Sequence, residues 1–236
     1  MENKQALTDE FVAGKTLLID KPYKWTSFDV VNKLKSLLRY ILKIKKIKIG
    51  HAGTLDPLAT GLLIVCTGKA TKEIEKFQKL DKTYTGTFIL GKTTPSFDLE
   101  TQTSEIIPIE HITAELIKRT TKSFIGEQQQ VPPLYSAKKI EGERAYTHAR
   151  KGEHRELKSV NINIKAFDVS RIELPEVDFR VTCSKGTYIR ALARDFGESL
   201  NSGAYLQSLK RTHIGTHSLN DAITIAHLEE IIRQVQ

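Results

Sequence analysis

The spacing of apolar residues constrains the fold of this chain more than any other feature. Strand-like runs at 15–20, 62–67 and 83–90 alternate with helical periodicities at 27–42 and 187–200. Regular alternation of strands and helices would be typical of a doubly wound parallel sheet. Because the spacing here is irregular, and no internal repeat is present, the sequence predicts an α+β fold.

The rest of the chain continues this mixed pattern. A polar excursion is expected at 91–109. Residues 126–158 hold Pro132, Pro133 and a crowd of charges, a composition that suits a long, mobile surface insertion. The other expected elements are helices at 70–80, with Ile74 and Phe77 inward, at 113–124 and at 223–235, and strands at 162–172, 177–183 and 204–214.

Composition favours a soluble protein with a polyanionic partner. Of the 236 residues, 39% are hydrophobic and 27% are charged, which fits neither a disordered chain nor a membrane protein. The formal net charge of +8 suggests a polyanion as partner, because Lys and Arg neutralise phosphates and release counterions, although many basic proteins bind no nucleic acid. The polar start, MENKQALTDE, and the short aliphatic run at 62–65 predict a cytoplasmic protein with no membrane partner.

Cysteine and histidine usage argues against metal and cofactor sites. Cys66 and Cys183 stand in apolar text without a CxxC pair, so we expect two buried thiols in a reducing compartment. The histidines are scattered, with no HExxH motif, and no metal is expected. The phosphate-loop pattern fails at Leu63 and Ala70, so no nucleotide cofactor is expected either.

The segment GHAGTLDPLATG, residues 50–61, places a lone acid, Asp56, in a loop of small residues. An Asp before a proline often only closes a turn, and a functional role would need a partner for the carboxylate. The preceding helix is basic, with no acid between Val30 and Ile49. This surface either faces solvent or faces RNA, and the absence of acids favours RNA. Its cations are Lys33, Lys35, Arg39, Lys43, Lys45, Lys46 and Lys48.

A second segment, SKGTYIRALARD at 184–195, crowds cations at the start of a predicted helix with Thr187 as its cap. Cations at Lys185, Arg190 and Arg194 oppose the helix dipole. Either the side chains extend into water, or an anion such as a carboxylate or phosphate offsets the charge, for which the arginine fork is suited.

Together, LIDKP, GHAGTLDPLATGLL, DKTYTG, PPLYSAKK and CSKGTYIRALARD closely resemble the motifs of bacterial tRNA pseudouridine-55 synthases of the TruB family, over about 15–212. The resemblance implies a pseudouridine-synthase fold with a mixed, mainly antiparallel central sheet flanked by helices. It also implies one catalytic domain over 1–236, with a mobile RNA-gripping insertion at 124–158. The chain ends at Gln236, and we expect no C-terminal PUA domain of the kind that many family members carry.

The resemblance further implies that the chain isomerises uridine to pseudouridine at position 55 in the T-loop of tRNA, without metal or cofactor. No heptad pattern demands a dimer, and a monomer is expected. Asp56 matches the catalytic aspartate, Tyr84 the tyrosine that stacks on the target base, and Arg190 the arginine that pairs with the aspartate. The substrate-binding residues would be Lys21, His51, Tyr135, Tyr188 and Leu209.

Two alternatives stay open at this point. The chain could modify another or a wider set of RNA targets, or it could be a tRNA-binding folding helper whose catalysis is dispensable. The resemblance also leaves open whether Asp56 attacks the base, attacks the sugar or abstracts a ribose proton, and whether Asp56 or Tyr84 removes the C5 proton.

Overall fold

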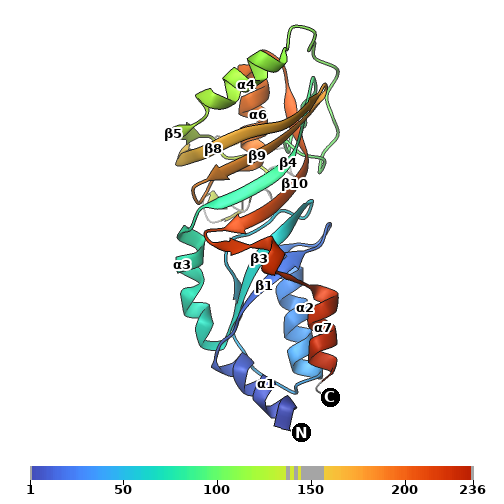
Figure 1. The fold of residues 1–236 in the computed structure, drawn as a ribbon, viewed down its shortest axis with the longest axis vertical. Coiled ribbons are helices and arrows are strands. Elements are labelled where there is room, and N and C mark those ends of the chain that lie inside the picture. The colour runs from blue at the N-terminus through green and yellow to red at the C-terminus, as the bar shows by residue number, and fades with distance from the viewer. Residues whose placement is uncertain (1, 137–138, 141–142, 145–156, 235–236) are drawn as a thin grey trace. The chain divides into compact units, whose positions relative to one another are not determined.

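A computed structural model describes residues 2–136, 139–140, 143–144 and 157–234. It confirms the α+β class, with a mixed sheet flanked by helices (Figure 1). The chain divides into two compact units, where the sequence predicted one domain over 1–236. Unit 1 comprises Met1–Tyr84 and Lys210–Gln236, and unit 2 comprises Thr85–Leu209. Each unit is described by itself.

The sheet of unit 1 mixes parallel and antiparallel pairs. β1 pairs antiparallel with β3 and parallel with β12, and β2 also pairs antiparallel with β3. The strand order in this unit is β12-β1-β3-β10-β4, and β4 and β10 have residues in both units. The strands are β1 (Thr16–Lys21), β2 (Ile49–His51), β3 (Ala59–Thr67), β4 (Lys82–Leu90), β10 (Ala204–Ile214), β11 (His217–Ser218) and β12 (Ile223–Thr224).

The helices of unit 1 bury the apolar positions that the sequence pattern indicated. In α2, Val30, Leu34 and Leu38 join a core with Leu228 and Ile232 of α7, and the two helices lie side by side (Figure 1). This helix confirms the periodicity expected over 27–42. The helices are α1 (Glu2–Ala13), α2 (Ser27–Tyr40), α3 (Ile74–Lys79) and α7 (Ile225–Arg233), with 3-10 turns at Gly68–Glu73 and Leu219–Asp221.

Unit 2 is built on a long antiparallel pairing of β8 with β9 and β5. Its strand order is β10-β4-β9-β8-β5. The core is aromatic: Phe88 stacks on Phe179 with ring centroids 4.0 Å apart, and both are buried. The further elements of this unit are α4 (Ala114–Ser123), β5 (Gly126–Gln130), β6 (Lys139–Ile140), β7 (Glu143–Arg144), β8 (Val160–Glu173), β9 (Glu176–Cys183) and α6 (Ile189–Ser199).

Several boundaries differ from the sequence predictions. The insertion expected from 124 does not begin there, because Gly126–Gln130 forms β5. The sequence GEQQQ has no apolar alternation, and its strand conformation comes from backbone hydrogen bonds to β8. The part of the insertion at 137–138, 141–142 and 145–156 lies outside the described residues. The helix expected over 70–80 begins as a 3-10 turn and becomes α-helical at Ile74.

The predicted cap of α6 is wrong. The helix begins at Ile189 with Tyr188 at the N-cap position, and Tyr188 makes no side-chain capping bond. The hydroxyl of Thr187 instead donates to the carbonyl of Ser184 at 3.0 Å, within the turn before the helix.

The N-terminal helix α1 had no sequence prediction. No helix in the described ranges is long and apolar enough to cross a bilayer.

Candidate active site

Asp56 lies in the connection of a β-hairpin in unit 1. β2 and β3 pair so that Gly50 is opposite Cys66 and His51 is opposite Val65. The amide of Ala52 continues the ladder by donating to the carbonyl of Ile64 at 2.9 Å. The chain between these strands forms a short loop, and Asp56 is partly exposed in it. The loop predicted at 50–61 is therefore shorter at both ends, because the strands extend into it.

The backbone on both sides of Asp56 is held by hydrogen bonds from other elements. Before it, the amide of Leu55 donates to Ser27 Oγ at 2.8 Å, and Ser27 Oγ donates to the carbonyl of Leu55 at 3.2 Å. After it, the carbonyl of Pro57 accepts from the amide of Lys24 at 2.9 Å. A loop fixed on each side of a carboxylate keeps that carboxylate in one place, as a catalytic group requires.

Lys21 is the predicted site residue that the structure brings next to this loop. Its ammonium donates to the carbonyls of Trp25 at 2.5 Å, Pro22 at 3.0 Å and Pro57 at 3.4 Å. The side chain is buried. Burial lowers its pKa to about 8, and the charge of Asp56 opposes that shift. Lys21 therefore both ties down the Asp56 loop and places a positive charge near the carboxylate.

Arg211, which sequence reasoning did not single out, fixes the base of the same loop. Its Nη2 donates to the carbonyl of Gly53 at 3.0 Å and its Nε donates to the carbonyl of Leu62 at 2.7 Å. The side chain is fully buried, where an arginine is sustained by such charge-assisted bonds. It lies in β10, and no local pattern connects it with a loop 158 residues away in sequence.

The environment of His51 disfavours its protonated form, although a backbone hydrogen bond with Gly53 opposes this effect. Burial and the nearby charge of Arg211 both lower the pKa of His51. Its Nδ1 is buried and has no hydrogen-bond partner among the described residues. A buried polar atom of this kind in a site is available to a ligand. Tyr84, the last residue of β4 that belongs to unit 1, follows the buried Lys82 and Thr83 and is itself buried.

In unit 2, Arg190 is buried rather than extended into water. Only 4% of its side chain is exposed, and its Nε lies 3.5 Å from Oδ2 of Asp98. Its Nη1 donates to the carbonyl of Ser96 at 3.1 Å and its Nη2 to the carbonyl of Tyr135 at 2.8 Å. The solvent alternative is thus wrong for Arg190, and the carboxylate paired with it here, Asp98, was missed by sequence reasoning.

Asp98 is itself held in place by neighbours of unit 2. Its carboxylate accepts from Ser96 Oγ at 2.6 Å and from the amide of Glu100 at 2.9 Å. These residues belong to the stretch that the sequence marked only as a polar excursion at 91–109. The TTPSFD text carries the Ser/Thr and Asp residues typical of local side-chain turns, which is the signal that could have drawn attention to it.

The other predicted residues of unit 2 are Tyr135, Tyr188 and Leu209, and the first two lie near Arg190. Tyr135 contributes its carbonyl to Arg190. The backbone of Tyr188 is clamped by Gln130 of β5, whose Oε1 accepts from the amide at 2.8 Å and whose Nε2 donates to the carbonyl at 3.2 Å. Leu209 lies in β10. Arg194 bonds to Asp195 and to the carbonyl of Val131, and does not extend freely.

The arrangement in unit 1 suits acid–base or nucleophilic chemistry by the carboxylate of Asp56, with the basic side chains of Lys21 and Arg211 nearby. Across the described part of the chain, no group of three His, Cys, Asp or Glu side chains could hold a metal ion. The expectation that the chain works without metal or cofactor stays a prediction. The thiols of Cys66 and Cys183 are both buried, as expected.

Comparison with known proteins gives a consistent match. The family model described as TruB family pseudouridylate synthase (N terminal domain) matches residues 39–189. The tRNA pseudouridine synthase B of Flavobacterium johnsoniae is 56% identical over 228 residues, which cover 95% of this chain and 99% of that protein. The protein of the same name from Parabacteroides distasonis is 53% identical over 225 residues, 95% of this chain and 96% of that one.

Solved structures are similar over most of this chain. The crystal structure of a Cbf5-Nop10-Gar1 complex contains a chain that matches with a TM-score of 0.69 and 28% identity, over 93% of this chain and 54% of that one. The structure of an H/ACA RNP bound to a substrate RNA containing 2'-deoxyuridine matches with a TM-score of 0.68 and 26% identity, over 96% and 55%. This chain therefore spans about half the length of those two chains.

Proposed function

The chain belongs to the TruB family of pseudouridylate synthases, and from this premise we propose that it isomerises uridine to pseudouridine at position 55 in the T-loop of tRNA. The observation that carries the proposal is the loop of Asp56. Its carboxylate stands between backbone segments tied to Ser27, Lys21 and Arg211. The net charge of +8 favours binding of an anionic substrate such as RNA, and a carboxylate held in one place can then react with it.

The reaction explains the types of residue required. The target base must leave its stack, which costs a few kcal/mol, and an aromatic ring such as that of Tyr84 offsets part of the cost by stacking. A carboxylate such as that of Asp56 acts as nucleophile or base. The bond between N1 and the ribose carbon breaks, the uracil turns, and C5 forms the new bond to that carbon. The C5 proton then leaves and N1 gains a proton, so product and substrate have the same mass.

The cations have defined tasks in this proposal. Lys21 bonds to the carbonyl of Pro57, directly after Asp56, and places a positive charge near the carboxylate, while Arg211 bonds to the carbonyl of Gly53 in the same loop. Arg190 is the proposed partner of the catalytic aspartate. Its bonds to Asp98, Ser96 and Tyr135 hold its guanidinium in one orientation. A fixed guanidinium supports the proposed role, because pairing with a carboxylate depends on the direction of its N–H groups.

The remaining assignments concern the substrate. We propose that the neutral imidazole of His51 lies beside the extruded nucleotide, where its unpartnered Nδ1 can bind it. Tyr188 and Leu209 would line the base pocket, and Tyr135 would act with the insertion on the T-arm of the RNA. We further propose that the enzyme acts as a cytoplasmic monomer, without metal or cofactor.

Replacing Asp56 tests the function directly. Asp56→Asn keeps the size of the side chain and removes its charge, so the variant should still bind tRNA but form no pseudouridine. Carbodiimide derivatisation of a tRNA transcript, read by primer extension, detects the product and maps its position. Normal product from Asp56→Asn would refute the proposal. Product at other positions from the unaltered enzyme would instead indicate a wider RNA target.

A further inference from the structure

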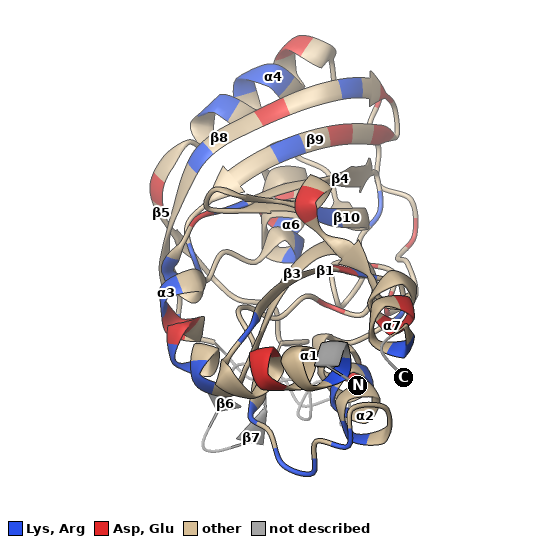
Figure 2. Cartoon of the chain, turned by 60° about the horizontal axis from the view of Figure 1, so that its bottom comes forward, with Lys and Arg blue, Asp and Glu red and all other residues tan. Residues whose placement is uncertain are grey.

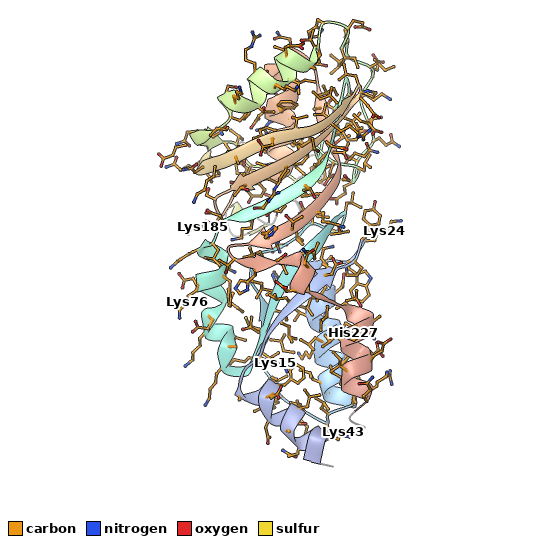
Figure 3. All side chains as sticks on the ribbon, in the orientation of Figure 1. Lys15, Lys24, Lys43, Lys76, Lys185 and His227 are labelled. Carbon is orange, nitrogen blue, oxygen red and sulfur yellow. The ribbon has the colours of Figure 1, made fainter. Side chains whose placement is uncertain are left out.

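A lysine-rich segment follows α2 in unit 1, and its apolar residues hold it against the core. Residues 41–48 read ILKIKKIK, and 42–48 contain neither helix nor strand. Ile41, Leu42 and Ile44 are buried in the same core as α2. The lysines between them are exposed, including Lys43, labelled in Figure 3 beyond the end of α2. An irregular segment pinned in this way presents its cations in a defined arrangement instead of a flexible tail.

Beside this segment lies a groove of about 450 Å³, within the size range of ligand sites. Side chains of α2 form one wall, the 47–50 stretch forms another, and Thr71 and Ile74 complete it. The groove residues that matter for recognition are Phe28, Asn32, Lys35 and Lys48. Phe28 is 64% exposed although it is aromatic.

Three polar side chains of this groove have no protein partners in the described ranges, whereas the hydroxyl of Thr71 donates to the carbonyl of Gly68 at 2.8 Å. No ion pair or hydrogen bond involves the side chains of Asn32, Lys35 or Lys48 in that part of the chain. By contrast, Lys33 on the same helix is paired with Glu229 at 2.6 Å. Lys33, which the sequence analysis counted among the cations of an RNA-facing surface, is therefore paired within the protein. Lys35 and Lys48 are left to face an external anion.

Acids near the groove are already engaged. The carboxylate of Asp29, next to Phe28, accepts from the amide and hydroxyl of Thr26 at the start of the helix. Glu73 and Glu75, beside Ile74, form ion pairs with Lys76 and Lys79. Figure 2 shows basic residues along α2 and the segment that leaves it. The local charge is thus positive and little compensated.

We infer that the Phe28 groove binds a nucleotide of the substrate RNA other than the target uridine. Phe28 supplies a stacking surface, Lys35 and Lys48 bind the adjoining phosphates, and Asn32 offers an amide to the base edge. A phosphate-binding patch alone would not need an exposed aromatic ring. This inference rests on the proposed function for the identity of the RNA, and it concerns a site that performs no chemistry.

Two variants test the groove through binding of a tRNA transcript, measured by fluorescence anisotropy across a range of salt concentrations. Phe28→Ala should weaken binding about fivefold or more, which corresponds to the loss of one base stack. Lys35→Ala/Lys48→Ala should lower the slope of log affinity against log salt by about 1.4 to 1.8, for two lost phosphate contacts. In both variants kcat at saturating RNA should stay unchanged while KM rises.

A matched control separates a groove from general charge. Lys118→Ala/Lys122→Ala removes two exposed lysines from α4, with the same change in net charge and without altering the groove. Equal losses in both double variants, or unaltered affinity in Phe28→Ala, would overturn the inference. If the unaltered protein forms no pseudouridine but the groove variants still lose RNA affinity, the proposed function fails and the groove stands.

Discussion

At the scale of single residues, the site depends on side chains that bond to backbone. Lys21, Ser27 and Arg211 each reach the Asp56 loop through its carbonyls or amides rather than through the carboxylate. Backbone partners tolerate changes in loop side chains, but they require the anchoring side chain itself. The site therefore includes more than the motif around Asp56, because the side chains that hold this loop come from α2, β1 and β10.

The shifted pKa of Lys21 predicts a pH dependence. Its ammonium is charged below about pH 8 and neutral above it. Deprotonation removes a positive charge near Asp56 and a donor to the carbonyl of Pro57, so kcat should fall as the pH rises through about 8. Single-turnover rates between pH 6 and 10 would measure this alkaline limb, the fall of the rate with rising pH.

Lys21→Arg provides the comparison for that limb, because a guanidinium keeps its charge throughout this range. The variant should be slower overall, since the buried site is shaped for an ammonium, but its rate should not decline near pH 8. An alkaline limb that is the same in both proteins would assign the titration to another group and remove Lys21 from this role.

At the scale of elements, the start of α2 divides two tasks between adjacent hydroxyls. Thr26 caps the helix: its Oγ1 accepts from the amide of Asp29 at 3.0 Å, and the Asp29 carboxylate accepts from the amide of Thr26 in return. Ser27, one residue further, is buried and bonds to Leu55. Both residue types are common helix caps, and only the structure shows that Ser27 instead bonds to the Asp56 loop.

This division predicts different effects of two conservative substitutions. Thr26→Ala should lower the free energy of unfolding by about 1 kcal/mol through loss of the cap, with kcat little changed. Ser27→Ala leaves the buried amide of Leu55 without its partner, so it should cost about 1–3 kcal/mol and also lower kcat. Urea denaturation and single-turnover assays on both proteins measure the two quantities. Unaltered kcat in Ser27→Ala would argue against loop positioning by this hydroxyl.

At the scale of the whole molecule, the charge balance predicts how the protein meets its substrate. A net charge of +8 and the unpaired lysines at 43–48 should make tRNA binding strongly dependent on salt. We expect affinity to fall at least about tenfold between 50 and 200 mM salt. Titrations with Asp56→Asn should give the same slope, because that substitution removes no cation. A flat dependence would contradict an electrostatic contribution of this size.

The sequence by itself determined what depends on near neighbours along the chain. The periodicity of α2, the runs of β3 and β4, the lone acid at Asp56 and the basic stretch before it all follow from local pattern and charge. The ordered motifs also sufficed to identify the family. Local rules reach this far because helices and buried strands impose their periods on consecutive residues.

Only the tertiary structure decided which distant groups meet. β5 is a strand because β8 offers it backbone partners, although its own residues are Gly, Glu and Gln. Ser27 meets Leu55 across 28 residues, Arg190 meets Ser96 across 94, and Arg211 meets Gly53 across 158. Each of these bonds joins a side chain to a backbone group. Because residues of every type carry a backbone carbonyl, the residue type of the backbone partner gives no sign of the bond in the sequence.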